Sequence, residues 1–245
     1  MATEINYIAD GGSASLVSAK GGTLMTFRRK GTNILFPQTK VGEKIRGGMH
    51  YCLPQFGPPK GILKEIGQHG WLRNELLEIC SKSSKAMIFR GISKGRRGYP
   101  WMLEYLVNVS IDVEGILQVK LEVERPKDGI AGDAQINLAY HPYFRNLGMR
   151  AVKIGDREFD EFSEDANIVP LNGEKTLIID EGARKVKMTL YGFGEESHVA
   201  LWSDNKDYFC VEPMMTHMND FDTPKGRYLK QGEKIVLSIT IAVMT

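Results

Sequence analysis

The sequence predicts an all-β protein, a large antiparallel β-sandwich, because apolar and polar residues alternate in several segments and glycine-containing breaks separate those segments. Successive side chains of a strand point to opposite faces, so this alternation marks strands with one buried face and one solvated face. Many short strands separated by turn residues are typical of sandwiches and barrels. We find no long amphipathic helix, linker or composition shift, and therefore expect one domain over residues 1–245.

The expected strands follow from the pattern in chain order. Residues 107–113 and 117–124 alternate apolar and polar types, and the Glu-Gly pair at 114–115 between them suits a tight hairpin turn. Residues 186–190 and 235–243 have the composition of two further strands. These four segments would contribute alternating side chains to a common core.

Composition and charge exclude several classes of protein. The chain is 42% hydrophobic and 25% charged, so a core can form without disulfides or metal. The net charge of +2 provides no overall field for nucleic acid or an anionic membrane, and we expect neither as a partner. The three cysteines, Cys52, Cys80 and Cys210, form no C-x-x-C pair. The sequence shows no signal-peptide pattern and no apolar stretch near the about 18 residues that span a bilayer, so we expect a cytoplasmic protein.

Four segments have a composition that simple strands do not explain. They combine glycine, proline or aromatic residues with polar side chains. They are residues 44–57 with Arg46, residues 67–73 with Gln68, His69 and Arg73, residues 139–145 with His141, and residues 208–213 with Glu212.

Two of these side chains have the chemistry of proton transfer. Glu212 ends an apolar run, where partial desolvation raises the pKa of a carboxyl group toward that of a useful base. His141 carries an imidazole, which titrates near neutral pH. The pattern alone is also compatible with an ordinary strand-end carboxylate paired with an arginine and with a core histidine bonded to backbone. Arg46 and Arg73 could likewise be surface ion-pair residues or clamps for an anion or hydroxyl group.

Taken together and in this order, the four segments resemble the aldose 1-epimerase (galactose mutarotase-like) superfamily, most closely its hexose-6-phosphate mutarotases. The resemblance covers most of the chain. The matching motifs are Arg46-Gly-Gly-Met-His with Pro54-Gln-Phe-Gly57, Gln68-His-Gly-Trp-Leu-Arg73, His141-Pro-Tyr-Phe144 and Val211-Glu-Pro213.

The resemblance implies an active site in an open cleft on one face of the sandwich. It implies that the protein interconverts the α and β anomers of an aldohexose or its 6-phosphate, without cofactor or metal, as a monomer or weak dimer. His141 would be the general acid and Glu212 the general base, facing each other across a gap as wide as a pyranose ring. Four further residues would line the site or contact the sugar or its phosphate: Arg46, Gln68, His69 and Arg73.

Two departures from the family pattern bear on the substrate. The proline that follows the first glycines in the family is absent, and His50 stands in this part of the chain. The family's E-x-D-R-x-Y segment, whose Asp binds substrate hydroxyls, is also missing. The best alignment places Thr176 at that Asp, and Asp180 could replace it if the register shifts. The alternative is therefore a catalytically inactive carbohydrate-binding or complex-assembly protein that retains the fold.

Overall fold

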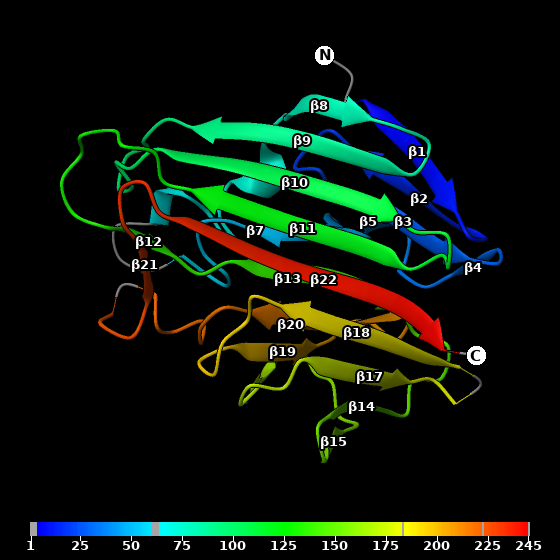
Figure 1. The fold of residues 1–245 in the computed structure, drawn as a ribbon. Coiled ribbons are helices and arrows are strands. Elements are labelled where there is room, and N and C mark those ends of the chain that lie inside the picture. The colour runs from blue at the N-terminus through cyan, green and yellow to red at the C-terminus, as the bar shows by residue number, and fades with distance from the viewer. Residues whose placement is uncertain (1–3, 60–63, 183, 222, 245) are drawn as a thin grey trace.

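A computed structural model describes residues 4–59, 64–182, 184–221 and 223–244, which form two large antiparallel sheets packed face to face (Figure 1). The first nine-stranded sheet has the order β1-β2-β3-β7-β13-β20-β19-β16, and β4 pairs with β3. Its strands are β1 (Ile5–Asp10), β2 (Ser13–Ser18), β3 (Leu24–Arg29), β4 (Thr32–Asn33), β7 (Met49–Cys52), β13 (Ala139–Arg145), β16 (Asn167–Pro170), β19 (His198–Trp202) and β20 (Tyr208–Met214). The all-β antiparallel sandwich expected from the sequence is confirmed.

The second nine-stranded sheet, at the front of Figure 1, has the order β15-β14-β17-β18-β22-β11-β10-β9-β8. Its strands are β8 (Glu78–Lys82), β9 (Ala86–Ser93), β10 (Leu103–Ile111), β11 (Leu117–Glu124), β14 (Ala151–Ile154), β15 (Arg157–Phe159), β17 (Thr176–Asp180), β18 (Lys185–Tyr191) and β22 (Lys234–Met244). Two small ribbons pair β5 (Thr39–Val41) with β6 (Lys44–Arg46) and β12 (Ala134–Ile136) with β21 (Arg227–Leu229). The 3₁₀ helix η2 covers Leu72–Asn74. The described residues contain no helix with the length and apolarity needed to span a lipid bilayer.

The strands predicted from alternation lie in the second sheet. The predicted limits of β11 agree with the structure, and β18 and β22 contain the segments 186–190 and 235–243. The preceding strand, β10, ends at Ile111 rather than at Val113. It ends there because one carboxylate oxygen of Asp112 accepts hydrogen bonds from the backbone N–H groups of Glu114 and Ile116, at 2.9 Å each. This local turn leaves Val113 73% exposed.

The central strands of the first sheet are covered on both faces. Every residue of β7 and β20 is buried, as are all residues of β13 except Arg145. One face packs on the second sheet across the core. Loops surround the opposite face, so polar side chains on that face are buried although they lie outside the hydrophobic core.

Gly70, in the second predicted site segment, allows two segments of backbone to approach closely. Its φ is +73°, and a Cβ atom there would lie 1.9 Å from the Leu53 carbonyl oxygen. A non-glycine residue in a left-handed backbone conformation costs ~1–3 kcal/mol of stability. Gly70→Ala adds a steric clash to this cost, so we expect it to lower the free energy of unfolding by more than that amount. Urea unfolding measures this. Gly31→Ala is the matched control, because Gly31 has φ +79° with no atom within 4 Å of the added Cβ. Equal losses in the two variants would contradict the prediction.

Candidate active site

A cleft of about 850 Å³ opens on the face of the first sheet that points away from the core. The central strands form its floor, and the loops around them form its walls. The cleft brings together six of the seven residues predicted from the sequence. They are Arg46, Gln68, His69, Arg73, His141 and Glu212.

Three polar side chains from adjacent strands form a row across this floor. β7 and β13 pair so that His50 lies directly opposite His141. The register between β13 and β20 places Glu212 opposite His141 on the other side. We call His50, His141 and Glu212 the floor row. Because they come from three neighbouring strands, sheet pairing alone fixes their order and spacing.

The alternation of strand side chains directs His141 into the cleft. The preceding residue, Tyr140, points into the core, where its hydroxyl donates to the Leu237 carbonyl at 2.7 Å and accepts from the Leu121 N–H at 3.1 Å. Both partners belong to the second sheet. Since successive residues of a strand face opposite ways, anchoring Tyr140 in the core places the imidazole of His141 on the cleft side.

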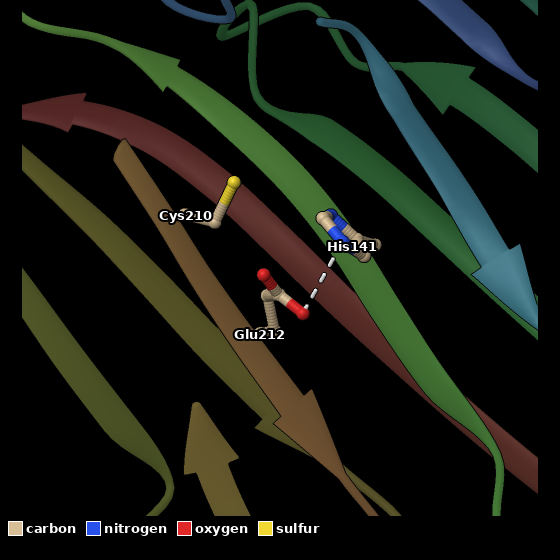
Figure 2. A group of neighbouring side chains, drawn as sticks. All are labelled: His141, Cys210 and Glu212. Carbon is tan, nitrogen blue, oxygen red and sulfur yellow. Dashed lines mark ion pairs between the residues drawn. The ribbon is translucent and has the colours of Figure 1, made fainter. Parts of the chain in front are cut away.

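The two proposed proton-transfer groups are in direct contact. The Nε2 atom of His141 lies 3.4 Å from the Oε2 atom of Glu212, and Figure 2 shows this carboxylate oxygen directed at the ring. The expectation that a pyranose-wide gap separates them is therefore wrong. Directly opposed residues of adjacent antiparallel strands have Cβ atoms only about 5 Å apart. The imidazole and carboxylate consequently lie side by side, and both reach a bound ligand from below.

Burial sets the protonation of this pair. Desolvation raises the pKa of Glu212 well above its ordinary 4.5, partly opposed by a hydrogen bond from the thiol of Cys210. Desolvation also lowers the pKa of His141 well below 6.5, and the neighbouring His50 and His69 lower it further. Both shifts favour the uncharged forms. The pair therefore holds a single shared proton between its two pKa values.

Two more imidazoles surround His141. The ring of His50 stacks on it at a centroid distance of 4.4 Å, and the ring of His69 meets it edge-on at 4.9 Å. Burial, followed by the charge of Arg73, lowers the pKa of His69 to about 3. The Nδ1 atom of His69 accepts a hydrogen bond from the Gly57 N–H at 3.2 Å, which leaves Nε2 as the protonated nitrogen of the neutral ring.

Arg46 is held by a carboxylate that sequence interpretation missed. Its Nη2 atom lies 2.5 Å from Oδ2 of Asp204, in the loop after β19. The hydroxyl of Tyr208 donates to the other carboxylate oxygen. The guanidinium carbon also lies 5.1 Å from the ring centroid of Trp202, a cation–π contact. Arg46 is therefore fixed in place, and its ion pair with Asp204 carries no net charge.

Arg73 differs from Arg46 in its electrostatic surroundings. It belongs to η2 and lines the cleft. Among the residues that the structure describes, no carboxylate lies within ion-pair distance of it. Its positive charge lowers the pKa values of His50, His69 and His141, which shows that its field reaches the floor row. Within the described residues, Arg73 is thus a cation without a carboxylate partner, close to the floor row.

The seventh predicted residue, Asp180, lies outside the cleft, and this prediction is corrected. Asp180 ends β17 in the second sheet, where its carboxylate accepts from the Gly182 N–H at 2.8 Å and lies 3.6 Å from the ammonium group of Lys185. Thr176 begins the same strand. Since the second sheet packs behind the first, residues of β17 cannot reach the opposite face of the first sheet.

One group in the described part of the chain could hold a metal ion. Ligand atoms of His141, Cys210 and Glu212 lie within 4.8 Å of one another (Figure 2). Nitrogen, sulfur and oxygen donors of this kind suit Zn²⁺. A cation bound there would occupy both members of the acid–base pair.

Comparisons with known proteins agree with the fold. The family model for aldose 1-epimerase matches residues 7–175. The Slr1438 protein from Synechocystis sp. PCC 6803 is 14% identical with a TM-score of 0.80, over 100% of this chain and 97% of that one. A galactose mutarotase related enzyme from Lactobacillus acidophilus is 16% identical with a TM-score of 0.78, over 99% and 98%. A putative aldose 1-epimerase from Escherichia coli K12 is 15% identical with a TM-score of 0.75, over 99% of each chain.

A search of curated proteins finds no match. The solved structures share the fold at low sequence identity, and the family match covers more than half of the chain. The chain belongs to the aldose 1-epimerase family.

Proposed function

We propose that the protein interconverts the α and β anomers of a hexose 6-phosphate, with His141 and Glu212 as its acid–base pair and without a cofactor. Membership of the aldose 1-epimerase family supports anomer interconversion. The observation that carries the assignment of residues is the 3.4 Å contact between His141 and Glu212 on the floor of the cleft.

The chemistry requires one acid and one base at neighbouring oxygens. Opening the pyranose ring removes the proton of the C1 hydroxyl and adds one to the ring oxygen, and closure on the other face of C1 reverses both transfers. Both oxygens are bonded to C1, so two groups that lie side by side can serve them. A pair that shares one proton supplies both roles. Each positioned proton transfer contributes about 10²–10⁴-fold to the rate.

The resting proton must move before ring opening begins. Burial places it on Glu212 and leaves His141 neutral. Its transfer from Oε2 of Glu212 to Nε2 of His141 creates a carboxylate base and an imidazolium acid. Arg46 lowers the pKa of Glu212 and therefore favours the ionised carboxylate. In this arrangement Glu212 accepts the proton of the C1 hydroxyl and His141 protonates the ring oxygen.

The charge of the cleft favours a phosphorylated sugar. Arg73 has no acidic partner among the described residues, and Lys20 also lines the cleft. A guanidinium can donate two parallel hydrogen bonds to a phosphate. Tyr143 and Phe56, which also line the cleft, would provide apolar contact surface for the sugar.

Exchange NMR tests this function directly. Saturation transfer between the C1 protons of the two anomers should show acceleration by the protein, larger for glucose 6-phosphate than for glucose at equal concentration. The alternative, a carbohydrate-binding or assembly protein without catalysis, is motivated by the position of Asp180 outside the cleft. It predicts binding of the sugar with no acceleration of exchange.

The shared proton can be tested by NMR titration of the free protein. Burial raises the pKa of the Glu212 carboxyl group well above 4.5, so this group should stay protonated at pH values where an exposed glutamate is already ionised. The ¹³C shift of the carboxyl carbon reports the titration midpoint, and loss of the signal in Glu212→Gln assigns it. A midpoint at or below 4.5 would contradict the proposed protonation state.

A further inference from the structure

The two arginines of the cleft have opposite electrostatic surroundings. Arg46 is 17% exposed and paired with Asp204, whose carboxylate also accepts from Tyr208. Arg73 has no such partner among the described residues. The Arg46–Asp204 ion pair has no net charge, whereas Arg73 has a charge of +1. An anionic ligand is therefore attracted more strongly to Arg73 than to Arg46.

A second cation lies close to Arg73. Lys20 forms an isolated bridge with Leu76, and the Gly21 N–H donates to the Glu75 carbonyl at 2.7 Å, so Lys20 lies beside the segment that holds Arg73. Both side chains line the cleft.

Two further carboxylates line the cleft near Arg46. The indole N–H of Trp202 donates to the Glu164 carbonyl at 3.1 Å, and Glu164 and Asp165 both line the cleft together with Lys44. The guanidinium of Arg46 lies over the same indole ring. The charges around Arg46 are therefore mixed, whereas those around Arg73 are positive.

We propose that Asp204 is a specificity-determining residue, which holds Arg46 as a neutral hydrogen-bonding unit for sugar hydroxyls and so leaves Arg73 as the cation that receives the phosphate. This inference rests on the proposed function and adds the orientation of the substrate to it. A guanidinium has more N–H donors than the one that bonds to Asp204, so Arg46 retains donors for hydroxyl oxygens. The Asp204 carboxylate offsets the charge of Arg46, so Arg46 attracts a phosphate dianion less strongly than Arg73 does.

The test is the affinity for inorganic phosphate and for glucose 6-phosphate, measured by calorimetry. Asp204→Asn keeps the size and a hydrogen-bonding side chain but removes the charge. Arg46 then becomes a second uncompensated cation, so both ligands should bind several-fold tighter than to the natural protein. Asp207→Asn is the matched control, because it removes the same charge from an exposed carboxylate of the same loop that does not line the cleft. We expect little change from it.

A double variant keeps the test valid if Asp204→Asn folds poorly. Arg46→Gln with Asp204→Asn replaces a neutral ion pair by a neutral amide pair, so affinity for inorganic phosphate should stay near that of the natural protein. An unchanged or weaker phosphate affinity in Asp204→Asn, equal tightening in Asp207→Asn, or loss of phosphate binding in the double variant would overturn the proposal. Phosphate binding needs no catalysis, so a failure of the proposed anomer interconversion would be seen separately.

Discussion

Replacing Glu212 by glutamine should reduce the enzymatic rate of anomer interconversion by about 10²–10⁴-fold, because the amide can no longer exchange a proton with His141 or accept one from the C1 hydroxyl. His141→Asn should have an effect of the same size. The double variant should be no slower than either single variant, since the two groups act as one unit around a shared proton. Exchange NMR on glucose 6-phosphate gives all three rates.

A histidine outside the cleft provides the control for these variants. His198 is half-buried on β19 and does not line the cleft. His198→Asn should therefore leave the rate unchanged, and urea unfolding should show that all variants are folded. Rates near that of the natural protein in both Glu212→Gln and His141→Asn would remove the catalytic assignment and favour the binding-only alternative.

Replacing Arg73 by glutamine should remove the preference for a phosphorylated substrate. Hydrogen bonds to charged groups contribute about 1.5–3 kcal/mol, which corresponds to roughly 10–150-fold in affinity. We expect kcat/KM for glucose 6-phosphate to fall by a factor in this range, while kcat/KM for glucose changes little. The measurement is the anomerisation rate at several concentrations of each sugar.

The matched control is an arginine at the surface. Arg97 is exposed, lies 3.2 Å from the carboxylate of Glu65 and does not line the cleft. Arg97→Gln changes the net charge by the same amount and should leave both substrates unaffected. An equal loss for glucose and glucose 6-phosphate in Arg73→Gln would show that this residue does not bind the phosphate.

Sequence patterns predicted the second sheet better than the first. Solvent-facing strands such as β11 alternate visibly, and the limits of β11 followed directly from the sequence. The central strands β7, β13 and β20 are buried on both faces and show no alternation of polarity. A continuous apolar run does not reveal which residues face a cleft. The site residues on these strands were therefore predicted from the resemblance to a family and not from the polarity pattern.

Register explains which site residues could not be predicted. Asp204 reaches Arg46 from 158 positions away along the chain, and no motif links the two. His50 lies beside His141 only because β7 and β13 pair in one register. The prediction for Asp180 was wrong for the same reason, since spacing in the chain does not indicate which sheet a strand joins.

The floor row stands on strands that are hydrogen-bonded on both edges and anchored from below by residues such as Tyr140. Backbone amides in such positions should be among the slowest in the protein to exchange with deuterium, whereas those of the surrounding loops should exchange early. Substitutions, insertions and deletions in the loops could then change which sugar is admitted while leaving the imidazole and carboxylate in place. Ligand selection and proton transfer can therefore evolve separately in this architecture.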